Sequence, residues 1–269
     1  MDVSIVIINY NTYDLTTDCV HSVIEFTKDL FYEIIVVDNA SKAFNENEFR
    51  ARFPEVKLVM CEKNLGFAGG NNLGNQYATG KYILLLNSDT YLKENAILTT
   101  FKYLEARPKV GVVSARLIFP DGRHQSVAQR FPSPKYLMIE LFRLQKLLSK
   151  REAGKLLLGA FFNHDENTEV DWVWGAYFMF RKEILEQLPL KKLDDSYFMY
   201  FEDMQWCMDI KKIGYKVHFC ADAEVVHIMG GSSGNKIKLM EQYEPVFLER
   251  NFLKIEVWLI QKLKKILTQ

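Results

Sequence analysis

Residues Ser4–Asn11 read SIVIINYN, and the first part of this stretch, Ser4–Ile8, is an unbroken apolar run of mainly β-branched residues. Such a run suits a strand that is buried on both faces of a sheet. Working outward along the chain, runs of the same character recur at Glu33–Asp38 (EIIVVD), Val56–Met60, Tyr82–Leu86 and Val110–Ser114.

Helical patterns fill the gaps between these runs. After the first run, apolar residues recur at Leu15, Cys19 and Val23, and the segments Ala68–Thr79 and Glu94–Ala106 also read as helices. Because strands that alternate with helices form parallel sheets, we predict an α/β fold with a mostly parallel central sheet flanked by helices.

Polar side chains stand at the ends of three of these strands. Asn9 and Asp38 end the first two, and Asp89 follows the fourth within Asn87-Ser88-Asp89. Ligands of open α/β sheets bind beyond the carboxyl ends of the strands. Three polar strand ends therefore predict a site at this edge.

The second half of the chain is less regular. Strand patterns return at Tyr177–Phe180 and Lys216–Phe219, and Met204–Ile213 reads as a helix that Gly214 ends. Pro134–Arg151 reads as one helix with apolar and basic residues. We expect one compact domain over residues 1–235, in two halves (1–115 and 116–235), followed by a helical tail at 236–269.

Composition excludes several classes of protein. Lys plus Arg and Asp plus Glu both number 34, and this balance argues against a nucleic-acid binder. The four cysteines form no CxxC pair, so we expect reduced, buried thiols. With neither a signal-peptide pattern nor an apolar run of about 18 residues, we expect a cytoplasmic protein.

Two motifs of the first half could bind phosphate or metal. Asn64–Gly74 (NLGFAGGNNLG) fits neither the P-loop nor the GxGxxG pattern, so a phosphate loop and a plain turn that opens a helix both stay open. Asp89, directly after a buried strand, could hold a divalent cation, although a lone Asp there is also typical of an Asx-turn or a helix cap.

The second half offers a candidate base. Glu202 and Asp203 follow the aromatic run 197–201, and their partial burial would raise the proton affinity that a general base needs. Acidic residues are also ordinary in a first helical turn. Trp174 could stack on a sugar or serve the core, and His227 after an apolar run could be a ligand or a core residue.

The order of the motifs is more specific than any one of them. The chain resembles the inverting family 2 glycosyltransferases, rhamnosyltransferase-like members above all, over about residues 3–233. The motifs that carry this resemblance are Ser4–Asn11, Val37–Ser41 (VDNAS), Asn64–Gly74, Asn87–Thr90 (NSDT), Trp174–Ala176 (WGA), Phe201–Asp203 (FED), and His227 followed by Gly230-Gly231-Ser232-Ser233.

The resemblance implies a GT-A fold with a nucleotide-sugar half and an acceptor half. It also implies the role of each matching residue. These roles are the catalytic base for Asp203; donor binding for Asn9, Tyr10, Asn11, Asp38, Asn71, Asn87 and Ser88; acceptor binding for Trp174, Gly175 and Glu202; and binding of Mg²⁺ or Mn²⁺ for Asp89 and His227.

One departure from the family pattern concerns the metal. Asn87 replaces the first Asp of the DxD motif, so the loop offers one carboxylate and the donor diphosphate must supply more of the charge. The resemblance favours dTDP-rhamnose as donor, with UDP-hexoses as the second choice, and a lipid-linked surface glycan as acceptor.

The tail adds a possible contact with the membrane. Within 252–267, Phe252, Ile255 and Leu259 begin an apolar stripe beside a cluster of lysines, a pattern typical of helices on anionic membranes. The same stripe could instead pack on the domain or form a homodimer interface. We expect a peripheral protein on the inner face of a bacterial cell membrane.

Two other functions stay open at this stage. A nucleotidyltransferase that makes sugar nucleotides would carry a glycine- and arginine-rich loop after the first strand, where this chain has Asn9–Thr12. A non-catalytic subunit that only binds nucleotide sugars would not need both Asp89 and Asp203.

Overall fold

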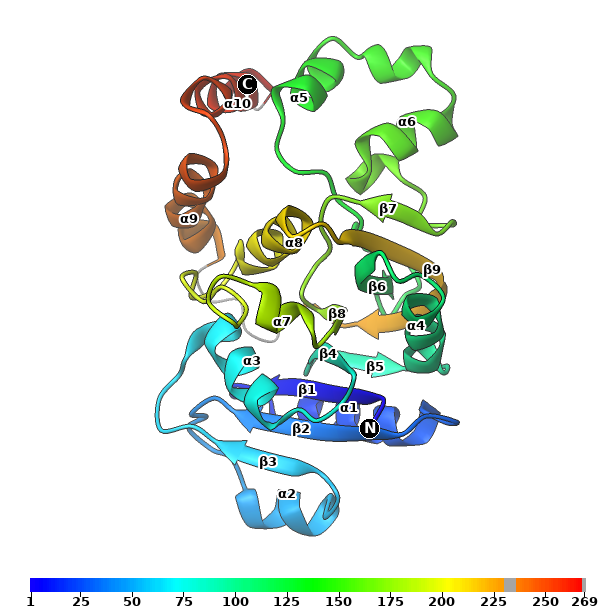
Figure 1. The fold of residues 1–269 in the computed structure, drawn as a ribbon, viewed down its shortest axis with the longest axis vertical. Helices are drawn as coiled ribbons and strands as arrows, with labels where there is room; N and C mark the ends of the chain where they lie inside the picture. The colour runs from blue at the N-terminus through cyan, green and yellow to red at the C-terminus, as the bar shows by residue number, and fades with distance from the viewer. Residues whose placement is uncertain (230–235, 268–269) are drawn as a thin grey trace.

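A computed structural model describes residues 1–229 and 236–267, with one β-sheet at its centre (Figure 1). The strands lie in the order β3-β2-β1-β4-β8-β6-β9-β5, and β7 pairs with β9. Their bounds are β1 Val3–Asn9, β2 Tyr32–Asp38, β3 Lys57–Met60, β4 Tyr82–Asn87, β5 Thr90–Leu92, β6 Val110–Ile118, β7 Thr168–Val170, β8 Tyr177–Arg181 and β9 Lys216–His227.

The first four strands form the parallel part of the sheet. β1 pairs in parallel with both β2 and β4, with Asn9 opposite Asp38 and Ile8 opposite Asn87. The strands end together because they are in register. The predicted meeting of polar strand ends at one edge is thereby confirmed.

Strand β8 interrupts the parallel order. It lies antiparallel between β4 and β6, whereas β6 and β9 are parallel to each other. The α/β fold is as predicted, but parallel pairing is limited to β1–β4 and to β6 with β9. The cause is non-local, since a strand from the second half inserts between two strands of the first.

Helices cover both faces of the sheet. Helix α1 buries Cys19 and Val20 and lies behind β1 in Figure 1, whereas α3 lies in front. A Cβ on Gly74 of α3 would come within 2.4 Å of Val6 Cγ1, so this glycine lets the helix approach β1 closely. The helices are α1 Tyr13–Phe26, α2 Glu46–Arg52, α3 Gly66–Tyr77, α4 Ala96–Glu105, α5 Pro134–Leu141, α6 Lys150–Leu157, α7 Ile184–Gln187, α8 Glu202–Lys212, α9 Lys236–Asn251 and α10 Lys254–Leu267.

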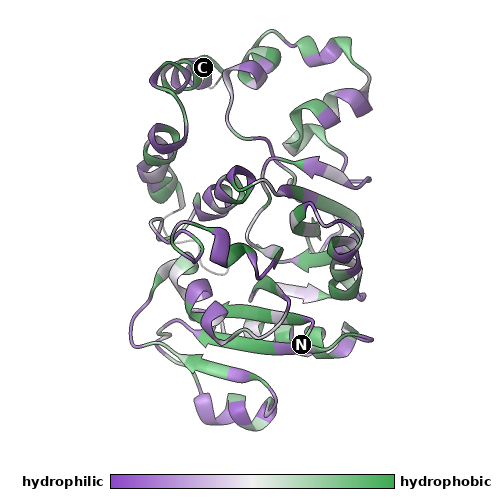
Figure 2. Cartoon of the chain, viewed as in Figure 1, coloured by the Kyte–Doolittle hydropathy of each residue, from purple (hydrophilic) through white to green (hydrophobic). Residues whose placement is uncertain are grey.

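The apolar core follows the strands, which are mainly green in Figure 2, while purple is frequent on the outer helices. Cys19, Cys207 and Cys220 are buried in this protein, Cys61 is partly buried, and all four are free thiols as predicted.

The single helix predicted at Pro134–Arg151 is wrong. The segment forms α5, a 3₁₀ turn at Leu144–Leu147 and α6. Arg143 takes a left-handed conformation (φ 54°) after α5, and Ser149 starts α6 through a capping box with Glu152. A left-handed residue ends a helix, and a capping box starts a new one.

The tail helices pack on the second half of the chain. Phe247 of α9 and Val257 and Ile260 of α10 are buried in a second apolar cluster, which also contains Tyr197 and Met204. The predicted boundary at 235/236 and the glycine-serine motif 230–233 lie outside the described residues. Within the part of the chain that the structure describes, no helix is both long and apolar enough to cross a membrane.

Candidate active site

A cleft of about 100 Å³ opens at the carboxyl ends of β1 and β4. It lies at the edge where the sequence predicts the site. Its walls come from the strand ends, from the start of α3 and from the aromatic loop before α8. The lining residues are Ile8, Tyr10, Thr12, Asn39, Asn64, Gly66, Phe67, Asn87, Ser88, Asp89 and Met199.

Asn9 positions Asp38. The Asn9 amide donates to Asp38 Oδ1 (2.6 Å) and to Ser41 Oγ (2.9 Å), and its oxygen accepts from Thr16 Oγ1 (2.6 Å) and Thr12 Oγ1 (3.2 Å). Since an amide has two donors and two acceptor sites, the capacity of Asn9 is used within the protein. Asp38, 1% exposed, keeps spare acceptor sites and is the better candidate for contact with a ligand.

A second asparagine network shapes the entry to α3. Asn39 donates to Asn64 Oδ1 and to the Gly66 carbonyl, both at 3.0 Å, and accepts from the Leu65 N–H at 2.9 Å. Neighbouring Asn11 is left-handed (φ 58°) and accepts from the Lys42 N–H. The motif Asn64–Gly74 is therefore a turn that is held by hydrogen bonds from Asn39, begins a helix and forms one wall of the cleft.

The NSD motif reaches the cleft from β4. Asn87 Oδ1 is buried and has no hydrogen-bond partner. Ser88 Oγ lies 3.1 Å from Thr12 Oγ1. A buried acceptor without a partner costs about 1–3 kcal/mol, so a donor or cation that satisfies Asn87 would bind favourably here.

Asp89 and His227 meet because β5 pairs with β9, which places Thr90 opposite His227. His227 Nε2 lies 3.3 Å from Asp89 Oδ1. His227 is only 6% exposed. The sequence placed these residues 138 positions apart, and the short strand β5 was not predicted.

Gln125 fixes the imidazole of His227. Its amide nitrogen donates to the His227 carbonyl (2.7 Å), so its oxygen must be the atom 2.7 Å from His227 Nδ1. A carbonyl only accepts, and the amide orientation therefore makes Nδ1–H the donor to Gln125. In the neutral ring the lone pair is then on Nε2, which faces Asp89.

These residues fit a divalent cation. A carboxylate oxygen and an imidazole nitrogen suit Mn²⁺, and metal-binding histidines usually donate their other N–H to a neighbouring acceptor. Among the described residues there is no group of three or more His, Cys, Asp or Glu side chains suited to a metal. A metal at Asp89 and His227 would thus need further ligands from the diphosphate of a donor.

Glu202 and Asp203 begin α8 after a strained turn. Tyr200 and Phe201 are both left-handed (φ 69° and 68°), which is costly for aromatic residues and often marks functional sites. This turn carries the two carboxyl groups into the boundary between the halves of the protein.

The two carboxyl groups differ in their environment. Burial and the neighbouring Asp203 raise the pKa of Glu202 well above its ordinary value, and Glu202 Oε2 has no hydrogen-bond partner. Burial raises the pKa of Asp203 to about 6, but N–H groups of Gly175 (3.1 Å) and Met204 (2.8 Å) stabilise its charged form. The two backbone N–H groups therefore favour the charged form at Asp203 over the charged form at Glu202.

Phe67 connects Asp203 to the cleft. Its ring lines the cleft and stacks on Trp206 of α8 at 6.0 Å. A Cβ on Gly175 would lie 2.9 Å from Phe67 Cε1 and 3.6 Å from Asp203 Cβ. The absence of a side chain at Gly175 thus allows Phe67 and Asp203 to lie close to the same backbone position.

Several predicted site residues do not line this cleft, Asn71 and Trp174 among them. Asn71 is 1% exposed and donates to the Phe67 carbonyl within α3, so the nearby wall of the cleft comes from Gly66 and Phe67 instead. Trp174 is partly buried and packs against the main core. Tyr10 lines the cleft as predicted.

Comparison with known proteins identifies the family. The sequence model described as glycosyl transferase family 2 matches residues 4–189, more than half of the chain. The chain belongs to glycosyltransferase family 2.

Relatives of this glycosyltransferase act in glycan synthesis. It is 23% identical over 237 residues to the low-salt glycan biosynthesis hexosyltransferase Agl10 of Haloferax volcanii, covering 84% of this chain and 67% of the relative. It is 26% identical over 173 residues to the rhamnosyltransferase WbbL of Escherichia coli, covering 60% of each. The predicted class of enzyme is confirmed.

Solved structures show the same fold. The glycosyltransferase matches residues 1–349 of S. aureus TarS in complex with UDP, with a TM-score of 0.57 and 16% identity over 84% of this chain and 60% of that chain. It matches GalNAc-T7 with UDP, GalNAc and Mn²⁺, with a TM-score of 0.63 and 18% identity over 92% of this chain and 49% of that chain. The predicted GT-A fold is confirmed, and the glycosyltransferase spans about half to two thirds of these proteins.

Sequence reasoning missed several residues of this site. Gln125, Asn39 and Phe67 were not among the predicted site residues, although the VDNAS and NLGFAGG motifs contain the last two. Gln125 carried no local signal, because its role depends on β9 lying next to the segment that contains it.

Proposed function

We propose that this glycosyltransferase moves one sugar from a nucleotide diphosphate donor to a hydroxyl of a surface glycan, with inversion at the anomeric carbon. The observation that carries the proposal is the arrangement of two carboxylates about the cleft. Asp89 lies in the cleft wall, and Asp203 accepts from the N–H of Gly175, which is next to the cleft-lining residue Phe67. One carboxylate can serve the leaving group and the other the nucleophile.

The first choice of donor is dTDP-rhamnose, with UDP-hexoses second. Similarity to the rhamnosyltransferase WbbL of E. coli supports rhamnose, and the UDP complex of TarS supports a pyrimidine nucleotide. Asp38, held by Asn9 at the end of β2, would accept a hydrogen bond from the base. Tyr10 and Asn11 would border the nucleoside.

In the proposed mechanism Asp203 acts as general base. The acceptor hydroxyl forms a bond to the anomeric carbon as the bond to the diphosphate oxygen breaks, and Asp203 takes the hydroxyl proton. Glu202, whose raised pKa favours the protonated form, would donate a hydrogen bond to the acceptor, and Trp174 and Gly175 would form the acceptor wall. Phe67 and Met199 would keep water from the reacting atoms.

Asp89 and His227 would hold Mg²⁺ or Mn²⁺ together with the donor. The metal would neutralise charge on the departing nucleotide. Asn87 would add a neutral oxygen ligand or a hydrogen bond, since its Oδ1 has no partner.

The acceptor is proposed to be lipid-linked, and the enzyme to work at the cytoplasmic face of the membrane. Helix α10 packs against α5, so the two amphipathic segments recognised in the sequence lie together (Figure 1). Exposed apolar side chains with nearby lysines suit an anionic lipid surface. The exposed apolar residues of this face are Met138, Phe142, Leu144, Leu147, Ile255, Trp258 and Ile266.

A panel of nucleotide sugars tests the donor. With Mn²⁺ present, saturation-transfer NMR should detect dTDP-rhamnose binding most strongly and UDP-hexoses more weakly. Asp203→Asn should keep donor binding and lower transfer by about 10²–10⁴-fold, the usual contribution of a general base. A panel without any binder would contradict the proposed function.

Slow donor hydrolysis distinguishes an enzyme from a subunit that only binds. Incubation of the wild-type protein with donor and Mn²⁺, but without acceptor, should release free nucleotide. Binding without any release would favour the non-catalytic alternative.

A further inference from the structure

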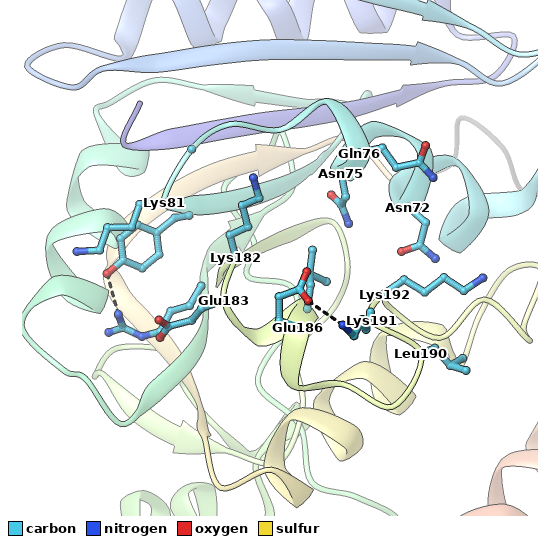
Figure 3. A pocket seen from close by; sticks show the side chains of 14 residues that line it. Asn72, Asn75, Gln76, Lys81, Lys182, Glu183, Glu186, Leu190, Lys191 and Lys192 are labelled. Carbon is cyan, nitrogen blue, oxygen red and sulfur yellow. Dashed lines mark hydrogen bonds and ion pairs between the residues drawn. The ribbon is translucent and has the colours of Figure 1, made fainter.

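A second cavity, of about 680 Å³, lies at the other end of α3 (Figure 3). Its walls are the last turns of α3, the start of β4 and the segment from β8 through α7 to Lys192. The donor cleft begins at Gly66, whereas Asn75 and Gln76 of this cavity are near the end of the same helix. The two sites share no lining residue, and their nearest lining residues on α3, Phe67 and Asn72, are about 8 Å apart along the helix axis.

The Asn75 side chain is the central observation. Asn75 is 7% exposed, and both its Oδ1 and its Nδ2 are buried without a hydrogen-bond partner. Figure 3 shows this side chain projecting from α3 toward Glu186. A buried amide with both ends unpaired is rare in folded proteins and calls for an explanation.

Asn72, one turn earlier, shows what a structural asparagine looks like here. Its Nδ2 donates to the Leu193 carbonyl (2.8 Å), and its Oδ1 accepts from the Leu193 N–H (3.1 Å). This pair ties α3 to the loop that forms the far wall of the cavity. The two asparagines line the same cavity, but only Asn75 has an amide that is available to a ligand.

The partner of Asn75 must both donate and accept. A carboxylate offers acceptors alone at neutral pH and would leave Oδ1 unpaired, and inorganic phosphate keeps an O–H donor but has no apolar face. Two adjacent hydroxyls of a sugar can satisfy both ends of the amide. The apolar side chains of Leu185 and Leu190 offer a surface for the apolar face of a sugar ring.

The charge of the wall favours an anionic sugar. Five cationic side chains line the cavity against two carboxylates, and Arg181 is occupied by the Tyr82 hydroxyl and by carbonyls. Lys81 and Lys192 pair at 2.6 Å with Glu105 and Asp195, which lie outside the lining, and Lys182 donates to the Ala78 carbonyl. Lys191 pairs with Glu186 at 3.4 Å, and both side chains are more than 70% exposed. Exposed pairs contribute little, so Lys191 can turn to a ligand at small cost.

We propose that this cavity is a second carbohydrate site, which binds a hydroxyl-bearing sugar that carries a carboxylate or a phosphate. Asn75 binds the hydroxyls, and Lys182, Lys191 and Lys192 attract the anionic group. The proposal concerns binding alone, and it stands whether or not the donor and acceptor named above are correct.

NMR of the Asn75 side-chain amide tests the site in the full-length protein. The two amide signals are assigned by their loss in Asn75→Leu, a variant of similar shape. Trigalacturonate supplies the carboxylate and mannose 6-phosphate the phosphate, while maltotriose is the neutral sugar and inorganic phosphate the anion without a sugar.

At least one of the two charged sugars should shift the Asn75 amide signals saturably, and maltotriose should bind at least about tenfold more weakly. Inorganic phosphate should leave these signals in place. Equal binding of maltotriose would overturn the anionic assignment, and no shift with either charged sugar would overturn the site. A shift of the amide by phosphate alone would also overturn it.

Thermal melting separates binding from folding. Asn75→Leu should lose sugar binding with an unchanged or higher melting temperature, because it removes a buried amide without partners. Asn72→Leu should lower the melting temperature, because it breaks two hydrogen bonds to Leu193. A lower melting temperature for Asn75→Leu would assign Asn75 to the fold and contradict the proposal. UDP binding, measured in the same samples, reports the donor cleft independently.

Discussion

At the scale of single residues, the site depends on how its carboxyl groups are solvated. Asp203 receives two backbone N–H groups, whereas Glu202 Oε2 receives none. Negative charge is therefore better stabilised on Asp203 than on Glu202. The sequence placed both acids at the start of a helix but could not divide these roles, since the Gly175 N–H comes from another segment.

The pH dependence of transfer follows from this division. Burial raises the pKa of Asp203 to about 6, and only the ionised form accepts a proton. The value of kcat/KM should therefore be level above pH 7 and fall with decreasing pH, approaching about tenfold per unit well below pH 6. Steady-state rates from about pH 5 to pH 8 measure it.

Glu202→Gln is the matched control for this pH profile. Glutamine has the shape of glutamic acid but does not titrate. The fall of kcat/KM at low pH, which Asp203 causes, should therefore stay near pH 6 even where the rate itself changes. A limb that disappears in Glu202→Gln would assign the profile to Glu202 instead.

Gln125 should control the affinity for metal. Gln125→Met removes the acceptor that fixes the His227 ring, and the loss of such a partner typically costs about 10–100-fold in metal affinity. Gln125→Glu keeps an acceptor at Nδ1–H and should retain most of the affinity. Electron paramagnetic resonance of Mn²⁺ in the presence of UDP measures binding without turnover. If Gln125→Met bound Mn²⁺ with wild-type affinity, Gln125 would have no role in metal binding.

At the scale of elements, local sequence patterns predicted where helices and strands lie, but they did not predict which strands pair. The predicted helices Ala68–Thr79 and Glu94–Ala106 correspond to α3 and α4, with ends shifted by at most two residues. The strand β5 was missed because three residues carry too little periodicity. Its pairing with β9 nevertheless brings Asp89 to His227. Site residues on strand ends were thus predictable, while contacts across the sheet were not.

Gly66, the first residue of α3, contacts Phe198 in the aromatic loop 197–201. Its φ is +73°, and a Cβ would lie 2.4 Å from the Phe198 carbonyl oxygen, which accepts from the Phe67 N–H. Gly66→Ala should therefore displace this loop, lower kcat and destabilise the protein by about 1–3 kcal/mol. Denaturant unfolding and steady-state kinetics measure the two effects.

Gly122→Ala is the control for backbone strain alone. Gly122 also has a positive φ (+86°), but a Cβ there meets nothing within 4 Å. It should lose stability without loss of kcat. Equal kinetic effects of the two substitutions would refute a specific role for the Gly66–Phe198 contact.

At the scale of the whole molecule, α8, α9 and α10 share the second apolar cluster. Arg250 of α9 binds Asp194 at 2.6 Å, and the indole of Trp206 in α8 donates to the Asp194 carbonyl at 2.8 Å. The sequence predicted an appended tail, because an amphipathic stripe does not say what it packs against. Removal of the tail would expose Phe247 and its neighbours, so point substitutions are the better test of membrane binding.

Trp258 and Ile255 are the side chains to change. They are 52% and 60% exposed on α10, while Val257 and Ile260 hold this helix to the second cluster. The double variant Ile255→Ser with Trp258→Ser should keep its melting temperature, because it leaves those buried contacts intact. It should lose most of its flotation with anionic liposomes, since it removes apolar area from the face that would enter the lipid interface.

Phe31→Ser provides the control for this flotation experiment. Phe31 is 79% exposed and directly precedes β2, a strand that lies far from α10 in Figure 1. This variant should float like the wild type, and high salt should weaken the flotation of both, because lysines attract the anionic surface. Equal flotation of the double variant and the wild type would reject the membrane face. A double variant that changes only the molar mass in light scattering would instead assign the face to a homodimer.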